Sequence, residues 1–173
     1  MDCSFFRIEV ASRVTRRSLR LAVTLLAALC ILCATGYARQ ANPSDDSSIP
    51  AAGLLNPVDL IAILNAPSGE KPLILQVGSH VLFTEAHIPG AQYAGAARDA
   101  SGLQLLQQTV ENLPRDRFLV VYCGCCPWTK CPNIRAAYRQ LVSMGFKHVK
   151  ALYIETNFGA DWVTKGYPVA NGG

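Results

Sequence analysis

The chain has 173 residues, which is enough for one domain of ordinary size. Its formal net charge is +4, but residues 1–38 contain five arginines against two acidic residues, and the remainder contains 11 basic and 10 acidic residues. A nearly neutral remainder without a basic stripe argues against nucleic-acid binding, so we expect no nucleic-acid partner.

The first 38 residues have the pattern of an export signal. An arginine-rich start precedes an apolar run at 21–33, and small residues follow, among which Gly36-Tyr37-Ala38 resembles a cleavage site. We therefore predict a signal peptide over residues 1–38 and export of the protein, into the periplasm. Retention is the alternative, because the apolar stretch 21–38 is close to the shortest length that crosses a bilayer and would then anchor the protein in the membrane.

The rest of the chain alternates between strand and helix patterns. Residues 39–53 are rich in Pro, Ser and Asp, which predicts a flexible linker before a folded domain at 54–171. The expected elements, in order, are a helix at 58–64 after the Asn56-Pro57 start signal, a strand at 73–77, a brief helix at 83–87, a short strand at 92–94, a helix at 103–113, a strand at 118–122, a helix at 134–142 ended by Gly145, and a strand at 149–154. This alternation predicts a parallel α/β sheet in three layers.

The strand at 118–122 leads into a loop that is rich in cysteine. Its continuous apolar run is typical of a strand buried on both faces. Four cysteines follow within nine positions: Cys123, Cys125, Cys126 and Cys131. After Pro132 the apolar spacing becomes helical, and we expect Asn133 to cap this helix. A thiol at the carboxyl end of a parallel strand faces a helix N-terminus, which stabilises a thiolate or a bound anion, so we place the chemistry in this loop.

Three segments resemble the rhodanese-like domain, over most of residues 54–170. They are FTEAHIPGA at 83–91, Val120-Val121-Tyr122-Cys123, and an ending made of Gly145-Phe146, Val149, Trp162 and Gly166-Tyr167-Pro168-Val169. The resemblance implies a three-layer α/β domain in which helices flank a central parallel sheet. It also implies a sulfurtransferase or persulfide carrier with Cys123 as the catalytic nucleophile, and we expect no cofactor.

In that chemistry the Cys123 thiolate attacks a sulfane sulfur donor such as thiosulfate and becomes a persulfide. The sulfur then passes to a thiol or to cyanide, so the expected partners are a small sulfur-containing anion and a thiol acceptor. We predict that the loop's backbone N–H groups hold the anion and that Lys130 adds a positive charge. The predicted substrate-binding residues are Gly124, Cys125, Cys126, Pro127, Trp128, Thr129 and Lys130.

The chain departs from the family pattern at three places. The family usually has Asp-x-Arg where this chain has Gln76-Val77-Gly78, Ala86 replaces a glycine, and the cysteine loop is longer than usual. His87 is expected to pack and to form hydrogen bonds rather than to catalyse. A Cys-x5-Arg loop, as in tyrosine phosphatases or arsenate reductases, is excluded because the required arginine position is Thr129.

The three remaining loop cysteines have three interpretations. Cys125, Cys126 or Cys131 could attack a Cys123 persulfide, which would release sulfide and leave a disulfide. The four thiols could instead bind zinc or a cuprous ion, although the spacing is not a standard C-x2-C pair and no histidine lies in the loop. Third, a structural disulfide such as Cys126–Cys131 could shape the loop. The alternative function is therefore a non-enzymatic exported thiol module that binds a soft metal or exchanges disulfides.

Overall fold

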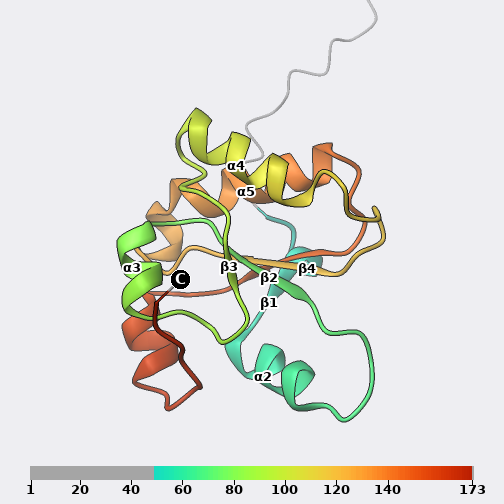
Figure 1. Cartoon of the computed structure of the whole chain (residues 1–173). Coiled ribbons are helices and arrows are strands. Elements are labelled where there is room, and N and C mark those ends of the chain that lie inside the picture. Colours follow the sequence, from blue (N-terminus) through green and yellow to red (C-terminus); the bar gives the residue numbers. More distant parts are fainter. Residues whose placement is uncertain (1–48, 173) are drawn as a thin grey trace, which may run out of the picture. The chain divides into compact units, whose positions relative to one another are not determined.

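The structure is a computed structural model, and it describes residues 49–172 (Figure 1). The predicted signal peptide and most of the predicted linker lie outside the described residues. Within residues 49–172, no helix has the length and the hydropathy that crossing a membrane requires.

A five-stranded parallel sheet in the order β1-β5-β4-β2-β3 forms the centre of the domain. Its strands are β1 (Leu54–Leu55), β2 (Leu73–Gln76), β3 (Gln92–Tyr93), β4 (Leu119–Tyr122) and β5 (Val149–Leu152). The helices are α2 (Pro57–Asn65), α3 (His80–Glu85), α4 (Ala100–Val110) and α5 (Pro132–Ser143), and short helical turns lie at η1 (Ala51–Gly53), η2 (Trp128–Lys130) and η3 (Gly159–Val163). The predicted parallel α/β sheet is confirmed.

The helices cover both faces of the sheet, which gives three layers (Figure 1). On one face α4 and α5 pack through Leu106, Ile134 and Leu141 against alternate strand residues. On the other face α2, α3 and η3 pack through Leu60, Phe83 and Trp162. Burying each of these large side chains contributes roughly 1.5–3 kcal/mol, so both ends of the cysteine loop are attached to well-packed elements.

β4 is the middle strand, and all four of its residues are buried. Leu119 and Val121 face α4 and α5, whereas Val120 and Tyr122 face the opposite layer. This confirms the two-sided burial that the apolar run predicts. Gln76 lies beside Tyr122 in the register of β2 and β4, so the segments that leave these two strands are neighbours.

Some element boundaries differ from the sequence-based prediction. The brief helix expected at 83–87 is α3, which begins at His80 and ends at Glu85. Asn133 does not cap α5: Cys131 occupies the cap position, Pro132 follows, and Asn133 is buried inside the first turn. Gly145 ends α5 with a positive φ of 88°, as predicted. The two-residue strand β1 has too few residues to show a periodic pattern.

His87 has the structural role expected for it. Its side chain is buried, its Nδ1 is 2.8 Å from the Phe83 carbonyl oxygen, and its ring stacks on the Phe83 ring at 4.0 Å. Its backbone exchanges hydrogen bonds with Ala170, which fastens the C-terminal segment to the turn after α3.

Candidate active site

The cysteine loop (residues 123–131) leaves the carboxyl end of β4 and enters α5. Gly124 has φ +72°, a backbone conformation that favours glycine, and its carbonyl accepts a hydrogen bond from the Phe158 N–H at 2.9 Å. A Cβ at this position would lie 2.8 Å from the Phe158 Cβ, which is too close for any side chain. The turn at Gly124 brings the side chains of Cys123 and Cys125 to the same side of the loop.

The thiols in the loop are free, and three of them lie close together. The Sγ atoms of Cys123 and Cys125 are 2.9 Å apart, and those of Cys125 and Cys126 are 3.6 Å apart. Both separations exceed the length of about 2.05 Å that a disulfide bond requires. Cys131 is also a free, buried thiol.

Asn133 contacts the sulfur atoms directly. Its Nδ2 donates to the Cys123 Sγ at 3.3 Å and approaches the Cys125 Sγ at 3.8 Å, while its Oδ1 accepts the Arg98 backbone N–H at 2.8 Å. The side chain is only 4% exposed, so α5 and the segment before α4 fix its position. Asn133 is therefore a hydrogen-bond donor to the cysteine sulfurs and not the helix cap that the sequence predicts.

The loop thiols differ in acidity because they share protons. Hydrogen bonds to Cys125 and Cys131, together with burial, raise the pKa of Cys123 well above its ordinary value. The Cys123 thiol, and to a lesser extent the Ser79 backbone N–H, lowers the pKa of Cys125 to about 6. The pKa of Cys131 is likewise lowered to about 6, chiefly by Cys123, whereas burial raises that of Cys126 to about 12. The directions of these shifts favour ionisation of Cys125 and Cys131 over that of Cys123.

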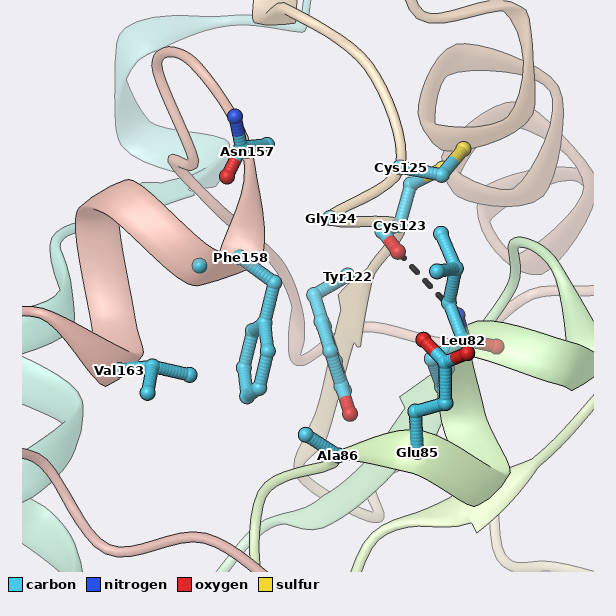
Figure 2. A pocket seen from close by; sticks show the side chains of 12 residues that line it. Leu82, Glu85, Ala86, Tyr122, Cys123, Gly124, Cys125, Asn157, Phe158 and Val163 are labelled. Atoms are coloured by element: carbon cyan, nitrogen blue, oxygen red, sulfur yellow. Dashed lines mark hydrogen bonds between the residues drawn. The ribbon is translucent and has the colours of Figure 1, made fainter.

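A cavity of about 370 Å³, which we call the thiol pocket, opens beside Cys123 and Cys125 (Figure 2). Figure 2 shows these cysteines between α3, which carries Leu82 and Glu85, and the C-terminal turn that carries Phe158 and Val163. The lining side chains are mostly apolar, and the polar ones besides the two cysteines are Gln76, Glu85, Tyr122 and Asn157. No lysine, arginine or histidine of the described residues lines the thiol pocket.

The predicted substrate-binding residues divide into two groups. Gly124 and Cys125 line the thiol pocket, together with Cys123. The residues that do not line it are Cys126, Pro127, Trp128, Thr129 and Lys130. The pocket residues that sequence reasoning missed come mainly from α3 and from the turn at 157–163, which no motif of the cysteine loop could indicate.

Fewer backbone N–H groups of the cysteine loop are free to bind an anion than the sequence predicts. The Trp128 N–H donates to the Glu155 carbonyl and the Lys130 N–H to the Pro127 carbonyl, both at 2.9 Å, so neither is available for an anion. The extra length of the loop folds into η2, where the Trp128 ring packs on the Tyr153 ring at 5.0 Å. The additional residues therefore pack near the end of β5 instead of surrounding Cys123.

Gln76 joins the ends of β2 and β4 at the position where the family usually has Asp-x-Arg. Its side chain is 2% exposed, and its Nε2 donates to the Cys123 carbonyl at 3.2 Å, as Figure 2 marks with a dashed line. Its Oε1 accepts the Gly78 N–H at 3.1 Å. An uncharged amide therefore ties the backbone of Cys123 to the neighbouring strand.

Replacing Gln76 by leucine is expected to lower the free energy of unfolding by about 1–3 kcal/mol, because the Cys123 carbonyl and the Gly78 N–H lose their partner while buried. Chemical denaturation measures this change. The exposed Gln107 of α4 provides a matched control, and Gln107→Leu is expected to change stability by less than about 0.5 kcal/mol. Equal stability of the two variants would contradict this role for Gln76.

No protein-family model and no curated protein sequence matches the chain. Solved structures do. The Alr3790 protein from Anabaena sp. matches with a TM-score of 0.53 and 22% identity, over 68% of this chain and 92% of that one. A second structure from Alr3790, described as a rhodanese-like domain, matches with a TM-score of 0.51 and 20% identity, over 69% of this chain and 79% of that one.

A thiosulfate sulfurtransferase from Pseudomonas aeruginosa matches with a TM-score of 0.52 and 24% identity. The match covers 71% of this chain but 20% of the Pseudomonas chain. At these identities the likeness concerns the fold. The chain has the rhodanese-like fold that its sequence motifs predict.

Proposed function

We propose that this protein is a sulfurtransferase that carries sulfane sulfur as a persulfide on Cys123. The observation that carries the proposal is the position of this thiol, at the carboxyl end of the central strand, in the lining of an open pocket and 2.9 Å from a second thiol. Ligands of parallel α/β sheets bind at this edge. The rhodanese-like fold supports the same class of chemistry.

In the proposed reaction, the Cys125 sulfur accepts the proton of the Cys123 thiol across their 2.9 Å contact. The Cys123 thiolate then attacks the sulfane sulfur of the donor. A new S–S bond forms, the donor's own S–S bond breaks, and its electron pair leaves with the remaining fragment, which is sulfite when the donor is thiosulfate. An acceptor thiolate or cyanide next attacks the outer sulfur of the persulfide, and the Cys123 thiolate is released. Asn133 Nδ2 holds the Cys123 sulfur in place during both steps.

The lining of the thiol pocket indicates the kind of donor. Leu82, Phe158 and Val163 offer apolar surface, whereas the only carboxyl group in the lining is that of Glu85. A doubly charged inorganic anion gains little from apolar surface and is repelled by a carboxylate. We therefore propose that the preferred donor has an apolar body attached to its sulfane sulfur.

Three donors with the same reacting sulfur test this preference: thiosulfate, methanethiosulfonate and benzenethiosulfonate. We expect kcat/KM for thiocyanate formation to be roughly 10–100-fold higher with benzenethiosulfonate than with methanethiosulfonate, because a buried ring contributes about 1.5–3 kcal/mol. Glu85→Gln is expected to raise kcat/KM for thiosulfate roughly threefold to tenfold. Glu111→Gln, which removes an exposed carboxylate outside the thiol pocket, is the matched control and should change nothing.

The outcomes separate the activity from the donor preference. Thiocyanate formation that is fastest with thiosulfate would overturn the preference and leave the activity intact. Absence of thiocyanate with all three donors would contradict the proposed function itself.

A further inference from the structure

Sulfur transfer through a persulfide needs one cysteine sulfur, but three cysteine sulfurs lie close together in this loop. The Sγ atoms of Cys123, Cys125 and Cys126, which we call the sulfur trio, all lie within 4.8 Å of one another. A sulfur-bound d10 metal ion holds each sulfur at about 2.3 Å, which places the sulfurs roughly 3.8–4.0 Å apart. Small rotations of the side chains would bring the trio to these separations.

The backbone around the sulfur trio fixes this arrangement. The positive φ of Gly124 turns Cys125 back toward Cys123, and Gln76 holds the Cys123 carbonyl. A second, smaller cavity of about 10 Å³ is lined by Cys123, Cys126, Cys131 and apolar side chains, so apolar groups surround the sulfurs there.

The chemical type of the ligand atoms determines which metal ion the sulfur trio favours. The sulfur trio contains neither histidine nor carboxylate, and sulfur-only sites favour soft ions such as Cu(I) over harder divalent ions. Asn133 Nδ2 donates to the Cys123 sulfur at 3.3 Å and approaches the Cys125 sulfur at 3.8 Å, and such outer hydrogen bonds orient metal-bound thiolates. The trio supplies three of the four ligands that a structural zinc site uses, because Cys131 does not belong to the group of sulfurs that lie within 4.8 Å of one another.

We propose that Cys123, Cys125 and Cys126 together bind one cuprous ion. Binding places the ion at the mouth of the thiol pocket, through which it enters and leaves, because two of the three ligands line that pocket. The site does not depend on the proposed function, since metal binding requires no sulfur transfer. Because the ion and a persulfide both need the Cys123 sulfur, they are alternative occupants of the same loop.

Anaerobic titration of the reduced full chain with Cu(I) against a coloured Cu(I) chelator tests the proposal. We expect one equivalent of Cu(I) to be withdrawn from the chelator, and X-ray absorption at the copper edge should show three sulfur neighbours without nitrogen or oxygen. Cys126→Ser should weaken binding at least about 100-fold, since it leaves two thiolates. The matched variant Cys131→Ser should keep the affinity within about threefold, because Cys131 is outside the sulfur trio.

Several results would overturn the proposal. These are failure to compete with the chelator, an absorption spectrum with four sulfur neighbours or with nitrogen or oxygen, and a loss in Cys131→Ser as large as that in Cys126→Ser. Binding of Zn²⁺ in preference to Cu(I), measured with the same protein, would also contradict it. The absorption spectrum of the unaltered chain counts the ligands without any variant, so misfolding of a variant cannot obscure the answer.

Discussion

Replacing Cys123 by serine is expected to abolish thiocyanate formation, with kcat/KM falling at least roughly 10³-fold, because the variant lacks the sulfur that forms the persulfide. A serine hydroxyl is nearly the same size as the thiol, so the buried position beside Asn133 and Cys125 stays filled. Thiocyanate release with benzenethiosulfonate and cyanide measures the effect. Thermal unfolding of the variant shows whether the fold is kept.

Cys125→Ser is the matched variant, because it removes the neighbouring thiol and leaves Cys123. A general base contributes about 10²–10⁴-fold, so this variant should lose activity in that range and still form the persulfide. An active Cys123→Ser beside an inactive Cys125→Ser would assign the persulfide to Cys125 instead. Since the pKa of Cys125 is lowered to about 6 and that of Cys123 is raised, the comparison decides which of the two thiols attacks the donor.

Gly124→Ala is expected to reduce kcat/KM roughly 10²-fold and to destabilise the protein. The new Cβ would lie 2.8 Å from the Phe158 Cβ, and an L residue at φ +72° costs about 1–2 kcal/mol. Relief of this contact must move the loop between Cys123 and Cys125, and a displacement of about 1 Å in a reacting group can reduce a rate about 100-fold. Steady-state kinetics and chemical denaturation measure the two effects.

Gly145→Ala provides a closely matched control. Gly145 has φ +88°, and nothing lies within 4 Å of the position that its Cβ would take. The variant therefore carries a similar backbone strain but lacks the steric contact that Gly124→Ala makes with Phe158. Its position lies at the other end of α5 from the cysteine loop. It should lose about 1–2 kcal/mol of stability and no activity. Equal loss of activity in both glycine variants would show that the geometry at Gly124 is not specifically required.

Local patterns were sufficient to predict the sheet and the position of the site. The apolar run of β4 requires burial on both faces, which only a central strand provides, and its end fixes where Cys123 lies. The glycine at 145 marks the end of α5, because its left-handed backbone conformation favours glycine over other residues. These features depend on neighbouring residues in the chain, so a single sequence contains them.

The details of the site depend on contacts between distant residues. Gln76 holds the carbonyl of Cys123, 47 positions later, and Arg98 orients Asn133, 35 positions later. Neither partner can be identified from spacing. The same holds for the apolar wall of the thiol pocket and for the path of the cysteine loop, which packs through Trp128 on Tyr153 instead of surrounding Cys123. Proton sharing among the thiols follows from their separation in space, which the sequence does not reveal.

Mass spectrometry after incubation with a sulfane donor tests the central claim most directly. The reduced full chain is incubated with benzenethiosulfonate without cyanide and is then digested and fragmented. The account predicts a mass increase of about 32 Da, one sulfur atom, on Cys123. An unmodified Cys123, or the added sulfur on Cys125, Cys126 or Cys131 alone, would contradict it.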